Sequence, residues 1–270
     1  MTPATHLVLM PTYNTGPRLA GVVAEVVARW PHVLVIVDGS TDGSDRPLRD
    51  LAAARRGLEM LVLPRNAGKG AAVLAGARVA LGRGFSHGLV MDADGQHPAQ
   101  SIGEFMAASR ARPEAMILGK PIFGPDVPLE RLHGRKLSMA MVQLEALGAG
   151  MADLLFGFRV YPLEPLLAVL GARRWGRRYD FDTESAVRLF WAGLPPINLA
   201  APVRYFTQAE GGVSHFRYVR DNLTLVWMHL RLITELLLWR WPAVWRLRRR
   251  WRSRGFRLAN DPALAPPLPG

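Results

Sequence analysis

The chain has 270 residues, a formal net charge of +12 and no cysteine. Its length suits one large α/β domain with a C-terminal appendage, and an apolar content of 49% excludes a wholly disordered chain. The lack of cysteine excludes disulfides, thiolate metal sites and a cysteine nucleophile. Because residues 1–5 lack the basic and apolar regions of a signal peptide, we expect a cytoplasmic protein.

Short apolar runs alternate with amphipathic stretches over the first 120 residues. The apolar runs predict buried strands at Leu7–Met10, Val33–Val37, Glu59–Leu63, Gly88–Met91 and Ala115–Leu118. The stretches between them predict helices near residues 17–29, 46–56, 69–82 and 99–110. This alternation is typical of an α/β fold with a mostly parallel sheet and helices on both faces.

Polar clusters follow the first four predicted strands. They are Pro11-Thr-Tyr13-Asn14, Asp38-Gly-Ser-Thr-Asp42, Asn66-Ala-Gly-Lys69-Gly70 and Asp92-Ala-Asp94-Gly-Gln96. Ligands of parallel sheets bind outside the carboxyl ends of the strands. We therefore expect the four clusters to meet at one edge of the sheet and to form a binding site there.

The fourth cluster carries two carboxylates, Asp92 and Asp94, and the side-chain amide of Gln96. Mg²⁺ and Mn²⁺ accept a few oxygen ligands of this kind and leave their other positions to water and phosphate. The cluster therefore predicts a divalent metal site that is open to a diphosphate. We interpret His97 as a loop residue rather than a ligand, because Pro98 follows it and such metals prefer oxygen.

Two further clusters allow a nucleotide. The Asp38 carboxylate either accepts an N–H of a base or serves as a solvated turn or helix cap. The run Asn66–Gly70 lacks the Ser or Thr of a Walker A loop, and Val73 stands where a dinucleotide fingerprint has its third glycine. The remaining interpretation is a glycine-rich helix N-terminus that binds an anion together with Lys69, one of the chain's three lysines.

After residue 120 the pattern is looser. A connection at 120–128 leads to a basic helix with Arg135 and Ser138, and a strand-like piece at 153–160 contains Arg159. Both arginines either neutralise phosphate or face solvent. A helix starts near Tyr179–Glu184, and a β-rich run follows at Ile197–Phe206.

The acids Asp182 and Glu184 at that helix start are either ordinary N-terminal helix charges or include a catalytic base.

An apolar helix at Leu223–Trp239 is interrupted by Arg231 and Glu235, so it is too polar to span a membrane. Residues 240–257 contain eight arginines and no acid, which leaves +4 of the total +12 for the remaining chain. Tryptophans interleaved with these arginines are typical of a membrane interface.

We therefore predict an amphipathic membrane-associating helix over 221–257 and a flexible Pro-rich tail over 258–270. The alternative is a helix packed on the main domain or on a second subunit. Nucleic acid is not expected as a partner, because the sequence near the arginines contains no recognisable nucleic-acid-binding motif. The sequence does not indicate the oligomeric state.

Over residues 6–220 the chain resembles glycosyltransferase family 2, especially its polyprenyl-phosphate branch, which is similar to dolichol-phosphate mannose synthase. The resemblance rests on the four polar clusters, on Gly157-Phe-Arg159 and on Asp182-Thr-Glu184, in the order and spacing of the family. It implies a GT-A fold, with a nucleotide-sugar half at 1–119 and an acceptor half at 120–220. It also implies a nucleotide-diphosphate sugar donor, Mg²⁺ or Mn²⁺, a lipid acceptor and inversion at the anomeric carbon.

The resemblance also implies roles for individual residues. The metal ligands are Asp92, Asp94 and Gln96. The donor-binding residues are Pro11, Tyr13, Asn14, Asp38, Asn66, Lys69 and Asp92. The acceptor or phosphate-binding residues are Lys120, Arg135, Ser138, Arg159, Ser214 and Arg217. The catalytic residues are Asp94, Asp182 and Glu184.

The sequence departs from the family pattern in three places. Val37 replaces the first of two aspartates, Gly119-Lys120 replaces Ser-Arg, and His215 stands where many relatives have lysine. We predict a polyprenyl phosphate as the acceptor. Because the last two departures border the lipid-phosphate site, the alternative is a hydroxyl of another lipid or polyene pigment. From a different class, the alternative is a catalytically idle, membrane-docked protein that binds nucleotide sugars. We expect the active enzyme, at the inner face of a bacterial cytoplasmic membrane.

Overall fold

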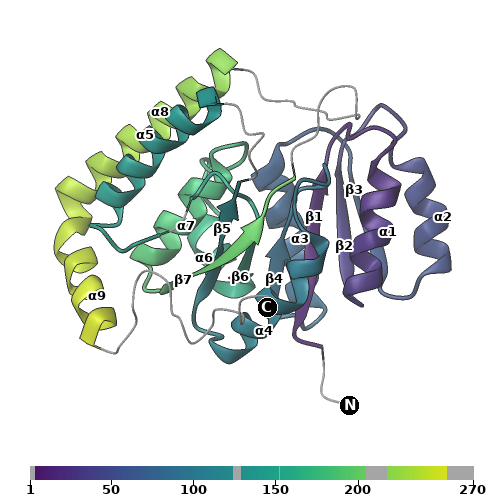
Figure 1. The fold of residues 1–270 in the computed structure, drawn as a ribbon, viewed down its shortest axis with the longest axis horizontal. Coiled ribbons are helices and arrows are strands. Elements are labelled where there is room, and N and C mark those ends of the chain that lie inside the picture. The colour runs from purple at the N-terminus through teal and green to yellow at the C-terminus, as the bar shows by residue number, and fades with distance from the viewer. Residues whose placement is uncertain (1–3, 124–128, 152, 205–217, 254–270) are drawn as a thin grey trace.

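The computed structural model describes residues 4–123, 129–151, 153–204 and 218–253 (Figure 1). Within them, a seven-stranded sheet has the order β3-β2-β1-β4-β6-β5-β7. The strands are β1 (His6–Thr12), β2 (Val33–Asp38), β3 (Leu58–Leu63), β4 (His87–Val90), β5 (Met116–Ile122), β6 (Arg159–Pro162) and β7 (Pro196–Pro202). The longer helices of the sheet domain are α1 (Leu19–Arg29), α2 (Arg46–Ala54), α3 (Lys69–Gly82), α4 (Ile102–Ala111), α5 (Leu129–Glu145), α6 (Leu163–Leu170) and α7 (Phe181–Trp191).

The sheet is mostly parallel, as the sequence predicts. β1 pairs in parallel with β2 and β4, β2 pairs in parallel with β3, and β5 pairs in parallel with β7. Only β6, among the described strands, runs antiparallel to its neighbours β4 and β5. The carboxyl ends of β1, β2 and β4 therefore point to the same edge, where their polar loops meet.

Alternating side chains of the strands supply two hydrophobic cores, one on each face of the sheet. In β1, Leu7 and Leu9 belong to the core under α3, whereas Val8 and Met10 belong to the core under α1 and α4. This period of two follows from the pleat of a strand. It explains why strands covered by helices on both faces read as continuous apolar runs.

Two predicted elements differ from the structure in burial or extent, and one helix was not predicted. β3 lies at the edge of the sheet, where only Leu58 is buried, so the expected burial of Glu59–Leu63 is wrong. The strand-like piece at 153–160 contributes only its last two residues to β6, which continues to Pro162. The helix α6 was not expected, because its eight residues give too short an apolar pattern to separate it from the preceding strand.

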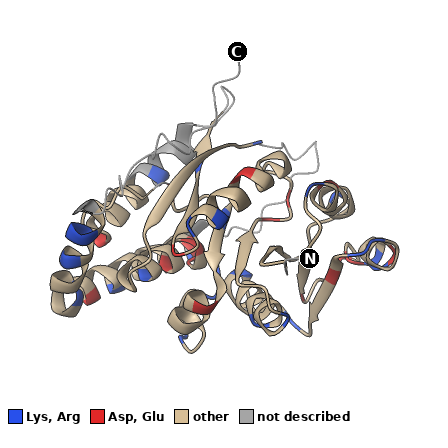
Figure 2. Ribbon diagram, turned by 90° about the horizontal axis from the view of Figure 1, so that it is seen from below, with Lys and Arg blue, Asp and Glu red and all other residues tan. Residues whose placement is uncertain are grey.

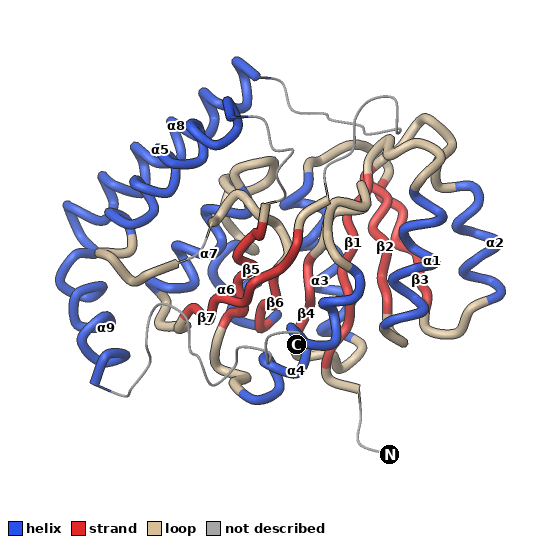
Figure 3. The backbone as a smooth tube through the Cα atoms, viewed as in Figure 1, coloured by secondary structure: helices blue, strands red, loops and turns tan. Residues whose placement is uncertain are grey.

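The C-terminal segment forms α8 (Tyr218–Glu235), a π-helical turn η3 (Leu236–Arg240) and α9 (Trp241–Ser253). Figures 1 and 3 show α8 beside α5 at one end of the molecule. Met228, Leu232 and Leu236 are almost fully buried in the core that contains α7. One face of this segment therefore packs on the main domain, as the alternative interpretation expected.

The other face of the segment is apolar and exposed. Trp227 is 54% exposed, Leu238 62% and Trp239 70%. The polar residues Arg231 and Glu235 turn inward instead and pair with side chains of α7. Among the described helices, none combines the length and the apolar content that crossing a membrane requires. The 258–270 tail lies outside the described residues.

Candidate active site

The polar loops meet at the carboxyl edge of the sheet, where two side chains hold them together. The buried Asp38 carboxylate accepts the backbone N–H groups of Ala67 and Gly68, each at 2.8 Å. The Asn14 side-chain oxygen accepts the N–H of Thr41 at 2.7 Å. Asp38 therefore fixes the third loop to the second, and its carboxylate is engaged by the protein itself.

The other predicted donor residues border the same edge. Pro11 is buried near the end of β1, and Tyr13 is half-buried in the loop that follows. The Asn66 side-chain oxygen accepts a hydrogen bond from Arg178 at 3.4 Å. The structure thus brings all four polar clusters together.

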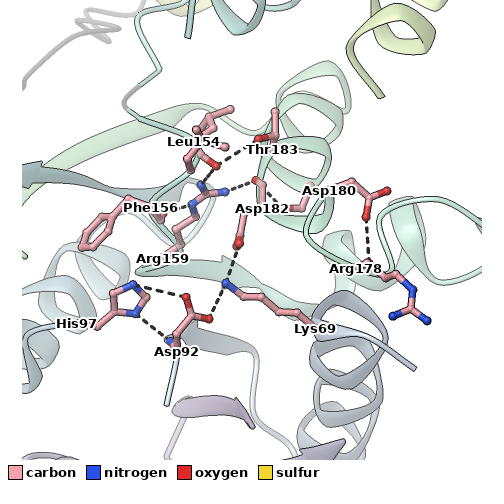
Figure 4. Close-up of polar contacts among 12 residues, drawn as sticks. Lys69, Asp92, His97, Leu154, Phe156, Arg159, Arg178, Asp180, Asp182 and Thr183 are labelled. Carbon is pink, nitrogen blue, oxygen red and sulfur yellow. Dashed lines mark hydrogen bonds and ion pairs between the residues drawn. The ribbon is translucent and has the colours of Figure 1, made fainter. Parts of the chain in front are cut away.

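Lys69 connects the metal motif to the start of α7. Its Nζ lies 2.6 Å from Asp92 Oδ1 and 2.7 Å from Asp182 Oδ2 (Figure 4). Burial by itself would lower the pKa of Lys69, but the two carboxylates outweigh it and raise the pKa well above the usual range. Burial would likewise raise the pKa of Asp92, but the charge of Lys69 outweighs it and lowers the pKa. The three groups form one charged unit with a single excess negative charge.

His97 orients Asp92. Its Nδ1 accepts the backbone N–H of Asp92 at 2.9 Å, so the tautomer that fits carries its proton on Nε2, which lies 3.8 Å from Asp92 Oδ2. The ring packs edge-on against Phe156 and Phe158. Burial lowers the pKa of His97 despite the nearby carboxylates, which keeps the ring neutral. Sequence reasoning missed this role, and the only signal was the position of His97 directly after the motif.

Asp94 and Gln96 complete the metal motif. Asp94 accepts the backbone N–H of Gln96 at 2.9 Å, and its pKa is raised by burial and then by the neighbouring charge of Asp92. Among the described residues, no three His, Asp or Glu side chains form a ready-made metal cage. Mg²⁺ typically binds one or two carboxylates together with substrate phosphates. The oxygen ligands present therefore fit a metal that binds together with a diphosphate.

Arg159 supports the backbone of Asp182 at the start of α7. The guanidinium is fully buried and donates to the backbone carbonyls of Leu154, Phe156 and Asp182 (Figure 4). It also donates to the Tyr161 hydroxyl at 3.0 Å. The expectation that Arg159 neutralises phosphate does not agree with this position, because its donors are used inside the protein. Its geometry is that of a positioning residue for Asp182.

Glu184 does not join Asp182. It is fully buried on another side of α7, where Arg188 lies 2.7 Å away and Arg231 of α8 lies 2.6 Å away. Burial would raise the pKa of Glu184, but the two arginines outweigh it and lower the pKa. The expected catalytic role of Glu184 therefore lacks structural support. Its two ion pairs tie α7 to α8.

The predicted acceptor residues are dispersed. Arg135 pairs with Asp153 at 2.5 Å, and Ser138 hydrogen-bonds His229 at 3.0 Å between α5 and α8. Lys120 is exposed on β5. Ser214 and Arg217 lie outside the described residues.

Gly157 is a site residue that the sequence suggested only through the family motif. A Cβ atom there would lie 2.5 Å from Lys69 Nζ, 3.2 Å from Asp92 Oδ2 and 3.4 Å from Asp182 Oδ1. The backbone of Gly157 thus forms the wall against which the three charged groups assemble. Any side chain would enter that space.

We expect Gly157→Ala to disrupt the site. The added methyl group must displace the Lys69 ammonium, and overpacking of this kind costs about 1–3 kcal/mol. Thermal unfolding should show a lower Tm, and transfer activity should fall by more than about tenfold. The control is Gly21→Ala, because a Cβ there meets nothing within 4 Å. A Gly157→Ala protein with wild-type Tm and activity would contradict the geometry.

Comparison with known proteins identifies the family of the chain. The model of the family "Glycosyl transferase family 2" matches residues 7–166. The chain is 32% identical over 214 residues to a polyprenol monophosphomannose synthase of Mycolicibacterium smegmatis, covering 77% of this chain and 79% of that protein. It is 28% identical over 186 residues to an undecaprenyl-phosphate mannosyltransferase of Micrococcus luteus, covering 67% of this chain and 76% of that protein.

The fold has solved counterparts. A mannosyltransferase from Pyrobaculum calidifontis, solved in complex with GDP-Man and Mn²⁺, superposes with a TM-score of 0.57 at 18% identity, covering 97% of this chain and 78% of that one. The family model extends from β1 through the metal motif into α6, and the mycobacterial relative matches most of both chains. The chain therefore belongs to glycosyltransferase family 2.

Proposed function

We propose that this glycosyltransferase moves a hexose from a nucleotide-diphosphate sugar to a polyprenyl phosphate, with inversion at the anomeric carbon. The observation that carries the proposal is the 2.7 Å ion pair between Lys69 and Asp182. A carboxylate held by an ammonium group is a poor general base. A phosphate acceptor is already an anion and needs no base, whereas a hydroxyl acceptor would have to lose a proton.

The reaction follows from these charges. A phosphate oxygen of the acceptor attacks the anomeric carbon from the face opposite the leaving group. The bond from that carbon to the nucleoside diphosphate breaks, and its electron pair remains on the diphosphate. No proton has to move. A divalent metal held by Asp92, Asp94 and Gln96 would supply charge stabilisation for the diphosphate.

The chain's own residues have distinct parts in this proposal. Lys69 places a positive charge between the metal motif and Asp182. Asp38 and Asn14 fix the loops that border the donor. Asp182 positions Lys69 rather than taking a proton. Residues 1–119 contribute the donor half and residues 120–220 the acceptor half.

We also propose that the protein works at the cytoplasmic face of the membrane, where a polyprenyl phosphate would present its head group. The exposed apolar face of α8 to α9 supports this, because large exposed apolar patches mark interaction sites. Lys and Arg recur along the helices at the left side of Figure 2, which suits an anionic surface. The names of the two bacterial relatives agree with a polyprenyl-phosphate acceptor.

A transfer assay tests the function. The purified protein is incubated with Mn²⁺, a panel of nucleotide sugars and either a polyprenyl phosphate or the matching polyprenol. We expect a glycosylated polyprenyl phosphate of inverted anomeric configuration, formed only with metal. Asp182→Asn should reduce this transfer mainly through the loss of Lys69 positioning. Efficient transfer to the polyprenol, or no transfer from any donor, would overturn the proposal.

A further inference from the structure

Two shallow hollows lie side by side along α8, apart from the Lys69–Asp92–Asp182 cluster. The larger measures about 680 Å³ and the smaller about 590 Å³, and they share Trp227 and Arg231. The larger one, here called the arginine hollow, is lined among others by Arg173, Arg231, Arg240, Glu235, Trp227 and Trp239. It therefore combines guanidinium groups with large aromatic side chains.

Two carboxylates, Glu235 of the lining and the fully buried Glu184, form ion pairs with guanidinium groups at or next to the arginine hollow. Glu184 pairs with Arg188 at 2.7 Å and with Arg231 at 2.6 Å. Glu235 pairs with Arg188 at 2.9 Å and with Arg240 at 3.2 Å. These two acids thus share three arginines, which already leaves one positive charge in excess.

Arg173 adds a fourth guanidinium to this group. Its Nε donates to the backbone carbonyl of Val169 at 2.9 Å, a bond that brings no negative charge. Its pKa is lowered by burial and then by the charge of Arg188. When the buried Arg188 and Glu184 are counted with the lining residues Arg173, Arg231, Arg240 and Glu235, four arginines and two glutamates leave an excess of two positive charges. A phosphate group carries one to two negative charges, which matches that excess.

The rim of the hollow is apolar and exposed. Trp227 is 54% exposed, Leu230 55% and Trp239 70%. Leu237 and Leu238, beside Trp239 in η3, are each 62% exposed. Tryptophan is favoured where a lipid head group meets its acyl chains. The hollow therefore offers cationic groups at its base and apolar surface at its edge, as the head of an anionic lipid requires.

The hollow is not part of the reactive centre. Glu184 follows Asp182 by two residues on α7, and each residue turns a helix by about 100°, so the two side chains leave α7 in nearly opposite directions. Asp182 points to Lys69, whereas Glu184 points to Arg231 of the hollow. Helix α7 thus separates the two regions, and a phosphate in the hollow is not the reacting acceptor.

We propose that the arginine hollow binds the phosphate head group of an anionic membrane phospholipid, with Arg173 and Arg240 as the principal contacts. This inference rests on the proposed membrane location, and it adds a discrete lipid site to the general attraction of a basic surface. A lipid bound there would hold α8, and through Glu184 also α7, at a fixed orientation to the membrane.

The test compares two double variants that remove equal charge. Arg173→Gln with Arg240→Gln alters the hollow, whereas Arg246→Gln with Arg249→Gln alters two exposed arginines of α9 outside its lining. Binding is measured to phosphatidylcholine vesicles with and without phosphatidic acid. Diffuse attraction should weaken both variants similarly, and the site should weaken the hollow variant about tenfold further. Thermal unfolding without lipid checks that both variants are folded.

Soluble ligands distinguish the sources of phosphate. Dihexanoyl phosphatidic acid should raise the Tm of the wild type and of the α9 variant but not that of the hollow variant. Equal losses of vesicle binding in both variants would overturn the site, and so would stabilisation by inorganic phosphate as large as that by the lipid. A wild-type protein that ignores anionic vesicles would overturn the site together with the membrane location. Vesicle binding without sugar transfer would count against the proposed function alone.

Discussion

Asp94→Asn should abolish metal-dependent transfer while leaving the fold as stable as in the wild type, or more stable. Burial and the neighbouring Asp92 raise the pKa of Asp94, so its ionised form is unfavourable in the folded protein without a cation. A carboxyl whose pKa is raised on folding makes stability fall as pH rises through its titration. Asparagine removes that penalty and also removes one carboxylate of the proposed metal site.

The expected loss of transfer is at least about 10²- to 10³-fold, the effect of removing a principal source of charge stabilisation. Mn²⁺ binding, followed by the paramagnetic resonance of the free ion, should be lost in parallel. Asp50→Asn on the exposed side of α2 is the control for removing one acid. Full activity of Asp94→Asn, or undiminished wild-type activity in excess chelator, would refute the metal-site assignment.

Asp92→Asn should behave differently from Asp94→Asn, although both remove a carboxylate from the same motif. Asp92 forms the 2.6 Å ion pair with Lys69, so its loss leaves a partly buried ammonium with one partner fewer. The pKa of Asp94 is raised and that of Asp92 is lowered. Loss of the Asp94 charge should therefore stabilise the folded protein, whereas loss of the Asp92 charge should destabilise it.

The sequence predicted the first five strands and the helices between them because their apolar patterns are strong and local. Because the carboxyl ends of parallel strands lie at the same edge of a sheet, the polar loops could be placed at that edge from the sequence alone. The direction of β6 was not predictable, because four residues carry no sign of antiparallel pairing. The inward turn of Arg231 and Glu235 was equally hidden, since a helical pattern shows a polar face but not what lies against it.

The site was predictable as a set of residues but not as a network. Lys69 and Asp182 are 113 positions apart, and Glu184 and Arg231 are 47 apart. Their pairings depend on how α7 packs between the sheet and α8. Two neighbouring acids, Asp182 and Glu184, looked equivalent in the sequence. The helix directs one to the metal motif and the other to α8.

Lys69→Met should destabilise the protein and inactivate it. The ammonium is the shared partner of two carboxylates, and the side chains of Lys69, Asp92 and Asp182 are 14%, 34% and 12% exposed. Removing one member of a buried ion pair costs about 3–5 kcal/mol, which partial exposure reduces to roughly 2–4 kcal/mol here. Urea unfolding should show this loss as a lower midpoint with an unchanged slope.

A second change separates the charge effect from packing. Adding Asp182→Asn to Lys69→Met removes one of the two unpaired carboxylates, so the double variant should regain part of the lost stability but none of the activity. Lys69→Arg should not replace the lysine, because the space between Gly157 and Nζ is too small even for a Cβ atom, which would lie 2.5 Å from Nζ, and a guanidinium is bulkier than the ammonium. If Lys69→Met unfolds at the wild-type midpoint, or if the double variant is less stable than Lys69→Met, then the ammonium does not hold the two carboxylates together. Asp182 would in that case be available as a base, and a hydroxyl acceptor would become the better explanation of the site.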